Sequence, residues 1–89
     1  MDTRTAEPTT VGEMLREEFL KPLNLTQEQL AKAMGVTAKV VNQIVNDQRR
    51  ITLDEALLLA RLFETDSSFW LNIQAAHDRW VIRQKITES

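Results

Sequence analysis

The sequence predicts an all-α fold of five helices in one small domain. Its 89 residues include only 2 glycines and 2 prolines, too few for the turns that a set of short strands would need. Apolar residues recur at helical spacing in several segments, and a side chain able to cap a helix precedes each of them. We therefore expect a single domain over 1–89, with flexible tails at about 1–9 and 85–89.

Three of the helix starts are predicted from a threonine followed three residues later by Glu or Gln. This capping-box pattern occurs at Thr10–Glu13, Thr26–Gln29 and Thr52–Glu55. The first helix should end at Lys21-Pro22, because a residue before proline avoids the helical region. The expected helices cover about 11–20, 26–35, 37–46, 52–63 and 66–84. On the fourth, the apolar positions at helical spacing are Leu53, Ala56, Leu57, Ala60 and Leu62 or Phe63.

The second and third helices, within 27–46, are joined by a tight turn. Gly35 lies where a left-handed cap ends the first of the two, and Thr37 suits the N-cap of the next. Ala31 is small where a crossing helix must approach, and the buried side is supplied by Leu30, Val41 and Ile44. This order is typical of a helix-turn-helix, whose second helix lies in the DNA major groove. The alternative is a plain helical hairpin with a glycine turn.

An acidic chain contains a basic segment at this motif. The net charge is −2 at pH 7, yet residues 29–50 carry four basic side chains and one acidic side chain. Residues 1–28 carry six acidic against three basic side chains, and residues 51–89 carry six against four. Phosphate contacts are local, so a local basic patch is what DNA binding requires. The acidic remainder predicts that a monomer binds DNA poorly and that a homodimer presents two patches.

The polar face of the third helix supplies candidate contacts to double-stranded DNA. Base contacts are expected from Ala38, Lys39, Asn42 and Gln43. Glutamine can pair with adenine, lysine can reach guanine acceptors, and an alanine methyl can touch a thymine methyl. Phosphate contacts are expected from Gln27, Thr37, Asn46, Arg49 and Arg50. For each of these residues the alternative is a solvated surface side chain.

The last helix carries more apolar surface than one face of a small core can use. One stripe contains Phe69, Ile73, Ala76 and Trp80, and an adjacent stripe contains Trp70, His77 and Val81. A dimer or partner interface is therefore expected from His77, Trp80, Val81 and Ile82. The alternative is that this helix packs back over the first helix and buries both tryptophans within one chain.

Four segments together resemble the HigA antitoxins, which include proteins called virulence-associated protein I. They read GEMLREEFLKPLNLTQEQLAKAMGV, VNQIVNDQRRIT, DEALLLARLF and SSFWLNIQAAHD, and cover about 11–78. The helix-turn-helix alone indicates a lambda-repressor-like DNA-binding fold of the XRE class, whereas FWLNIQ at 69–74 is the specific part. Two positions depart from the family pattern. Thr10-Val11 replaces the usual His-Pro, and Asp47 replaces the glycine that usually follows Asn46.

The resemblance implies a type II antitoxin that dimerises, binds a palindromic operator and represses its own operon. It also implies a protein partner, a HigB toxin, which is a RelE-like mRNA endonuclease that the antitoxin neutralises. Two alternatives remain open. One is a stand-alone helix-turn-helix regulator without a toxin, and the other is a protein-binding module without DNA affinity.

No enzyme, cofactor or metal site is expected from the sequence. His77 is the single histidine, and its neighbour Asp78 cannot face it on a helix. Cysteine is absent, so there is no disulfide, thiolate ligand or cysteine nucleophile. No apolar run reaches the length of a membrane span, and the N-terminus lacks the apolar region of a signal peptide. We therefore expect a cytoplasmic protein.

Overall fold

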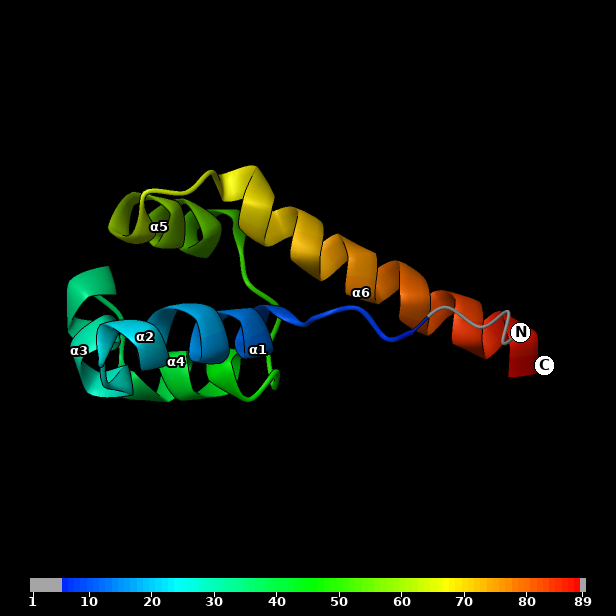
Figure 1. The fold of residues 1–89 in the computed structure, drawn as a ribbon, viewed down its shortest axis with the longest axis horizontal. Helices are drawn as coiled ribbons and strands as arrows, with labels where there is room; N and C mark the ends of the chain where they lie inside the picture. The colour runs from blue at the N-terminus through cyan, green and yellow to red at the C-terminus, as the bar shows by residue number, and fades with distance from the viewer. Residues whose placement is uncertain (1–5, 89) are drawn as a thin grey trace.

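The computed structural model describes residues 6–88, which form an elongated bundle of helices (Figure 1). The elements are α1 (Val11–Leu15), the π-helical segment η1 (Arg16–Leu20), α2 (Lys21–Leu23), α3 (Gln27–Met34), α4 (Ala38–Val45), α5 (Leu53–Phe63) and α6 (Ser67–Glu88). Because α1, η1 and α2 follow one another without a break, they make one helical rod, and four more helices follow. The predicted five-helix, all-α fold is confirmed, with no strand in residues 6–88.

The predicted end of the first helix is wrong, since the helix continues through Pro22 to Leu23. Proline cannot donate the backbone hydrogen bond of a regular helix, and its ring collides with the carbonyl four residues earlier. The π segment relieves this conflict by widening the turn, so that the Lys21 N–H bonds to the Arg16 carbonyl. The helix ends instead at Asn24, whose φ of 56° is the left-handed cap conformation.

An ion-pair cluster lies on the exposed side of the π segment. Glu17 accepts hydrogen bonds from Lys21 Nζ at 3.0 Å and from Arg16 Nε at 3.1 Å. These two hydrogen bonds, that of Lys21 first, lower the pKa of the Glu17 carboxyl below its ordinary value. Because the pKa is lower in the folded state, the ionised Glu17 carboxylate stabilises the fold at pH values above its ordinary pKa. This stabilisation is lost as the pH falls through the lowered pKa.

The caps agree with the sequence at two starts and differ at the third. Reciprocal capping boxes form at Thr26 with Gln29 and at Thr52 with Glu55. At the first helix, the Thr10 hydroxyl accepts from the Glu13 N–H at 3.1 Å. A second donor of that first turn, the Gly12 N–H, bonds to the Asp47 carboxylate at 2.9 Å. A residue distant in sequence therefore completes the cap.

The inward face of α5 differs from the predicted one. Ala56, Leu59 and Ala60 are buried as helical spacing requires, whereas Leu53 and Leu57 are 58% and 45% exposed. The capping-box residue Glu55 lies on the buried side instead, at only 7% exposure, where it pairs with Arg49.

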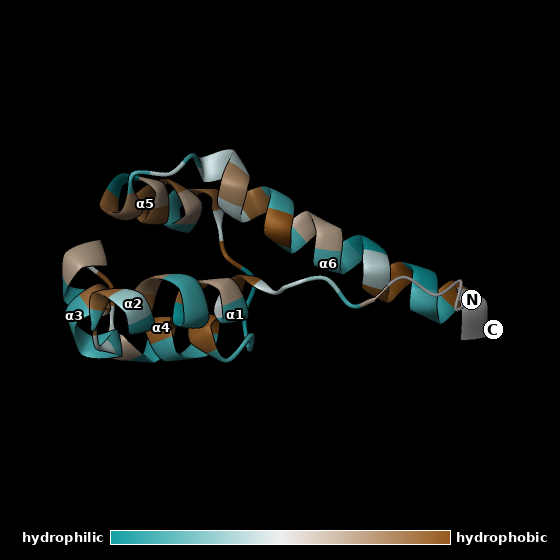
Figure 2. Cartoon of the chain, in the orientation of Figure 1, coloured by the Kyte–Doolittle hydropathy of each residue, from teal (hydrophilic) through white to brown (hydrophobic). Residues whose placement is uncertain are grey.

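The beginning of α6 packs against the hydrophobic core. Trp70 is completely buried and its ring lies 5.1 Å from the rings of Phe19 and Phe69. Beyond this aromatic cluster α6 runs past the other helices, which gives the molecule its extents of 43 × 23 × 22 Å (Figure 1). Hydrophobic and hydrophilic segments alternate along this projecting part (Figure 2). The helix reaches Glu88, beyond the expected end near residue 84.

The two tryptophans of α6 therefore differ in environment. The first helix does cover the beginning of α6, as the one-chain alternative requires, but it buries only Trp70. Trp80 is half-buried, with its ring 5.7 Å from that of His77. Of the tails expected to be flexible, residues 1–5 and 89 lie outside the described residues, so their flexibility stays a prediction.

Candidate nucleic-acid interface

The turn between α3 and α4 has the expected geometry. Gly35 ends α3 with a φ of 74°, and its N–H bonds to carbonyls of the preceding turn. The Thr37 hydroxyl caps α4 by accepting from the Val40 N–H at 3.3 Å. Ala31 is 4% exposed where the two helices meet. These contacts fix the turn between α3 and α4 as a helix-turn-helix requires.

The outer face of α4 is polar and accessible. The candidates Ala38, Lys39 and Asn42 are exposed, whereas Gln43 is half-buried. Asn42 Nδ2 on α4 donates to Gln27 Oε1 at the start of α3, at 3.1 Å. This bond brings a candidate base contact and a candidate phosphate contact together. We refer to these five residues, Gln27, Ala38, Lys39, Asn42 and Gln43, as the recognition face.

The two arginines of the loop after α4 form ion pairs with acidic side chains of other helices. Arg49 Nη2 lies 2.7 Å from Glu55 Oε2 on α5, and this pair is largely buried. Arg50 Nη1 lies 2.6 Å from Asp78 Oδ2 on α6, and the Arg50 side chain stays 67% exposed. The local excess of positive charge predicted from the segment count is therefore reduced by these folded partners. Among the described residues Lys39 forms no ion pair, so its charge remains available on the recognition face.

The first helix supports the far end of α4. Arg16 Nη1 donates to the Val45 carbonyl at 2.9 Å, placing a positive charge at the helix C-terminus, where it is favourable. At Gly12 the backbones approach so closely that an added Cβ would lie 2.5 Å from the Val45 oxygen and 2.6 Å from the Ile44 oxygen. The orientation of α4 thus depends on a glycine and an arginine that are outside the helix-turn-helix.

The candidate interface residues lie on the projecting part of α6. His77 Nε2 is 2.7 Å from Glu7 Oε2, so the segment before α1 is held against this helix. Val81 is half-buried, as is Trp80, and Ile82 is 55% exposed. All four predicted residues lie on α6, in the part of the helix that runs past the other helices (Figure 1).

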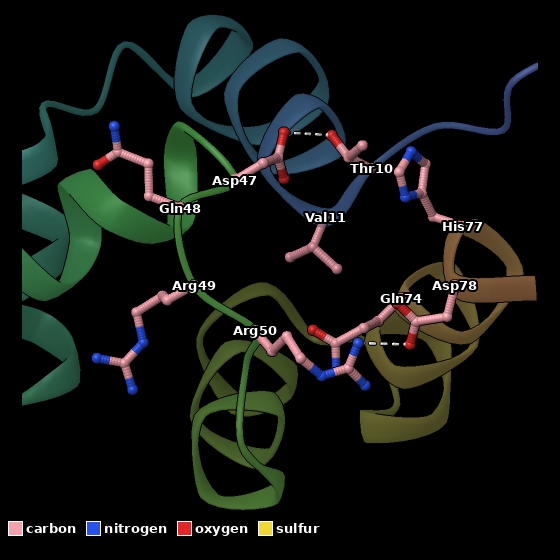
Figure 3. Close-up of a pocket in the computed structure, with 9 residues that line it drawn as sticks. All are labelled: Thr10, Val11, Asp47, Gln48, Arg49, Arg50, Gln74, His77 and Asp78. Carbon is pink, nitrogen blue, oxygen red and sulfur yellow. Dashed lines mark hydrogen bonds and ion pairs between the residues drawn. The ribbon is translucent and has the colours of Figure 1, made fainter. Parts of the chain in front are cut away.

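An open pocket of about 260 Å³ separates the loop after α4 from α6 (Figure 3). Its lining consists of Thr10, Val11, Asp47, Gln48, Arg49, Arg50, Gln74, His77 and Asp78. Two side chains of α6, Gln74 and Asp78, reach the loop across it. Within residues 6–88, no group of three or more His, Cys, Asp and Glu side chains could hold a metal ion.

A helix-turn-helix family model matches residues 15–70. The chain is 42% identical over 81 residues to the antitoxin HigA-1 of Vibrio cholerae, which corresponds to 91% of this chain and 76% of that protein. The chain belongs to the HigA family of helix-turn-helix antitoxins. The resemblance drawn from the sequence is confirmed.

Two further similarities agree with this HigA assignment. The chain is 52% identical over 67 residues to virulence-associated protein I of Dichelobacter nodosus, covering 75% of this chain and 62% of that protein. Its fold matches the Pseudomonas aeruginosa antitoxin HigA, solved with the higBA promoter, with a TM-score of 0.85 and 37% identity. That match covers 91% of this chain and 88% of the other.

Asp47, one of the departures from the HigA pattern, has a structural role. Its φ of 55° fits the left-handed turn that glycine usually occupies, a conformation that aspartate tolerates. Its carboxylate accepts from the Thr10 hydroxyl at 2.7 Å and from the Gly12 N–H. The negative charge therefore points to the N-terminus of the first helix, where the helix dipole favours it.

Replacing Asp47 by alanine should destabilise the fold by about 1 kcal/mol, because the first turn of α1 loses a capping partner. Urea unfolding followed by circular dichroism measures this change. The Asp47→Asn variant is the matched control, since it keeps an acceptor oxygen and the tolerance for positive φ, and should lose less. Equal losses in the two variants, or no loss in either, would remove the capping role.

Sequence reasoning did not identify Arg16, Gln74 or Asp78 as parts of this site. Each acts over a long sequence separation, and Arg16 belongs to a helix that the motif does not include. The four-residue spacing of Gln74 and Asp78, which places them on one face of α6, was the only available signal.

HigA proteins are DNA-binding regulators and not a known enzyme family. No helix within residues 6–88 is long and apolar enough to cross a membrane.

Proposed function

We propose that this HigA protein is an antitoxin that binds a palindromic operator as a homodimer and represses its own operon. The observation that carries the proposal is the recognition face, a polar and accessible helix surface held on a firmly packed helix-turn-helix. The structure of the similar Pseudomonas aeruginosa antitoxin HigA with the higBA promoter supports the same role. DNA binding in turn supports action in the cytoplasm.

Within the recognition face, Ala38, Lys39, Asn42 and Gln43 are the proposed contacts to base edges. Lys39 is the exposed cation among them and suits guanine N7 and O6, whereas Gln43 suits adenine. Asn42 is already bonded to Gln27, so the two amides form one unit at the α3 N-terminus. That unit suits a phosphate held by Gln27 and the backbone N–H groups, with Asn42 reaching the adjacent base.

The proposed phosphate contacts are Gln27, Thr37, Asn46, Arg49 and Arg50. Arg50 is the stronger of the two arginine candidates, because its exposed guanidinium keeps donors free of Asp78. Arg49 is tied to the nearly buried Glu55, so its removal should lower stability as well as DNA affinity. Asn46 Nδ2 bonds to the Asn42 carbonyl, which holds this amide at the end of α4.

Replacing Gln43 by alanine should cost about 1–3 kcal/mol of binding free energy at one base-pair position. The measurement is fluorescence anisotropy with the promoter duplex and with duplexes changed at single positions. The variant should discriminate less at one position of each half-site and bind random DNA as the parent protein does. Gln48→Ala, an exposed glutamine in the following loop, is the control. Equal losses on promoter and random DNA would rule out a base contact by Gln43.

The second half of the proposal is neutralisation of a HigB-like toxin, an mRNA endonuclease, and it rests on family membership. The projecting part of α6, with His77, Trp80, Val81 and Ile82, is the proposed dimer or partner surface. Co-purification with the product of the adjacent gene tests this half. Recovery of DNA-binding HigA with no nuclease partner would instead favour the alternative, a stand-alone regulator.

A further inference from the structure

The loop 47–52, which follows the recognition helix, is held by side chains as well as by its backbone, including the Arg49–Glu55 ion pair. The N–H groups of Asp47 and Gln48 bond back to α4, and the Thr52 N–H bonds to the Glu55 side chain. Between these anchors the chain bends at Arg49 and passes α6, where Ile51 is buried at 5% exposure. The position of Arg50 therefore depends on what holds the backbone at Ile51.

Gln74 on α6 holds that backbone in both directions. Its Oε1 accepts from the Ile51 N–H at 2.8 Å, and its Nε2 donates to the Ile51 carbonyl at 3.1 Å. The amide thus pairs with the peptide groups of Ile51 as a neighbouring strand would. One helical turn further along, Asp78 accepts from the Arg50 guanidinium at 2.6 Å. Figure 3 shows Gln74, Asp78 and Arg50 together on one side of the pocket.

We infer that Gln74 is a positioning residue for DNA binding, which fixes loop 47–52 so that Arg50 meets the DNA backbone at the end of the recognition helix. The inference rests on the proposed function, in which Arg50 contacts phosphate. Gln74 itself touches no DNA in this account, since it faces Ile51 from the side of α6. Gln74 orders the loop before DNA binds. Binding then does not include the entropy cost of ordering the loop, which would otherwise reduce the affinity.

The test is a double-mutant cycle between Gln74 and Arg50 on the full chain, with DNA affinity measured across a range of salt concentrations. Gln74→Met keeps length and packing but removes both hydrogen bonds. It should weaken promoter binding about tenfold and reduce the salt slope by about 1 per half-site. Arg50→Ala should do the same, and the double variant should lose little more than either single one. Such non-additivity is the signature of two residues that act through one contact.

A general loss of stability does not reproduce this pattern, because protein that remains folded would keep the parent salt slope. Affinities are therefore measured at a temperature where circular dichroism shows each variant to be folded. If Gln74→Met does not fold, Gln74→Glu retains the acceptor for the Ile51 N–H and should give a smaller loss of the same kind. Asn72→Ala is the matched control on α6, an exposed amide without a side-chain hydrogen bond among the described residues.

Two results would overturn the inference while leaving DNA binding intact. One is a parent-like salt slope in Gln74→Met when Arg50→Ala lowers it, and the other is full additivity in the double variant. If Arg50→Ala leaves the slope unchanged, both the phosphate contact and the positioning role of Gln74 are lost. If the parent protein does not discriminate the promoter from random DNA, the proposed function itself fails.

Discussion

Replacing Trp70 by alanine should destabilise the protein by about 3–5 kcal/mol, the largest effect of any single substitution considered for this chain. The side chain is completely buried and contacts the rings of Phe19, Phe63 and Phe69. Its Nε1 also donates to the Thr65 hydroxyl at 2.8 Å. The substitution removes the most deeply buried side chain by which α6 packs on the core, and leaves a cavity among the surrounding rings.

Urea unfolding followed by far-ultraviolet circular dichroism measures this loss. Trp70→Phe is the matched control, since it keeps a ring among rings and should lose less than the alanine variant. Trp80→Ala should also lose less, because that side chain is only half-buried. A Trp70→Ala protein as stable as Trp80→Ala would contradict the view that the beginning of α6 completes the core.

The second large effect is expected at Gly12, where alanine should cost about 2–3 kcal/mol. The added Cβ would lie within 2.5–2.7 Å of two carbonyl oxygens of α4 and of the Asp47 carboxylate. Backbone oxygens cannot move aside without displacing the end of the recognition helix. The variant should therefore lose DNA affinity as well as stability, even at temperatures where it remains folded.

Gly35→Ala is the informative comparison, measured by the same urea unfolding. Gly35 has a φ of +74°, but a Cβ there meets nothing within 4 Å. Its cost is the backbone strain alone, about 1 kcal/mol. We expect Gly12→Ala to be the more damaging substitution and the only one of the two that weakens promoter binding by the folded protein. The reverse order would show that the close approach of α1 and α4 is relieved elsewhere.

Local signals in the sequence were sufficient for most of the fold. Threonine with Glu or Gln three residues later located helix starts, and Gly35 located the turn of the motif, because both depend on neighbours in the chain. The end of the first helix was missed for a physical reason. The helix continues through Pro22 after a π-helical turn, and the residues at 16–20 carry no sequence signal that predicts such a turn.

Long-range pairing accounts for the rest of what the sequence did not reveal. Counting charges by segment placed an excess of basic side chains at 29–50, but Arg49 and Arg50 each pair with an acidic side chain from a helix outside that segment. Glu55 was predicted as a capping-box residue, and its burial at 7% exposure was not predicted. Asp47 was noted as a departure from the family pattern, and its bonds to Thr10 and Gly12 on the first helix were not predicted. The DNA contacts of the recognition face stay predictions.

The recognition face of α4 is proposed to read a specific DNA sequence. This proposal is tested most directly by comparing affinities of the full-length protein for its own promoter and for random DNA of equal length, at one physiological salt concentration. We predict promoter binding at least about 10³-fold tighter, with most of that ratio lost when Lys39 and Gln43 are both replaced by alanine. Equal affinity for the two DNAs, or a ratio that survives the double substitution, would contradict the account.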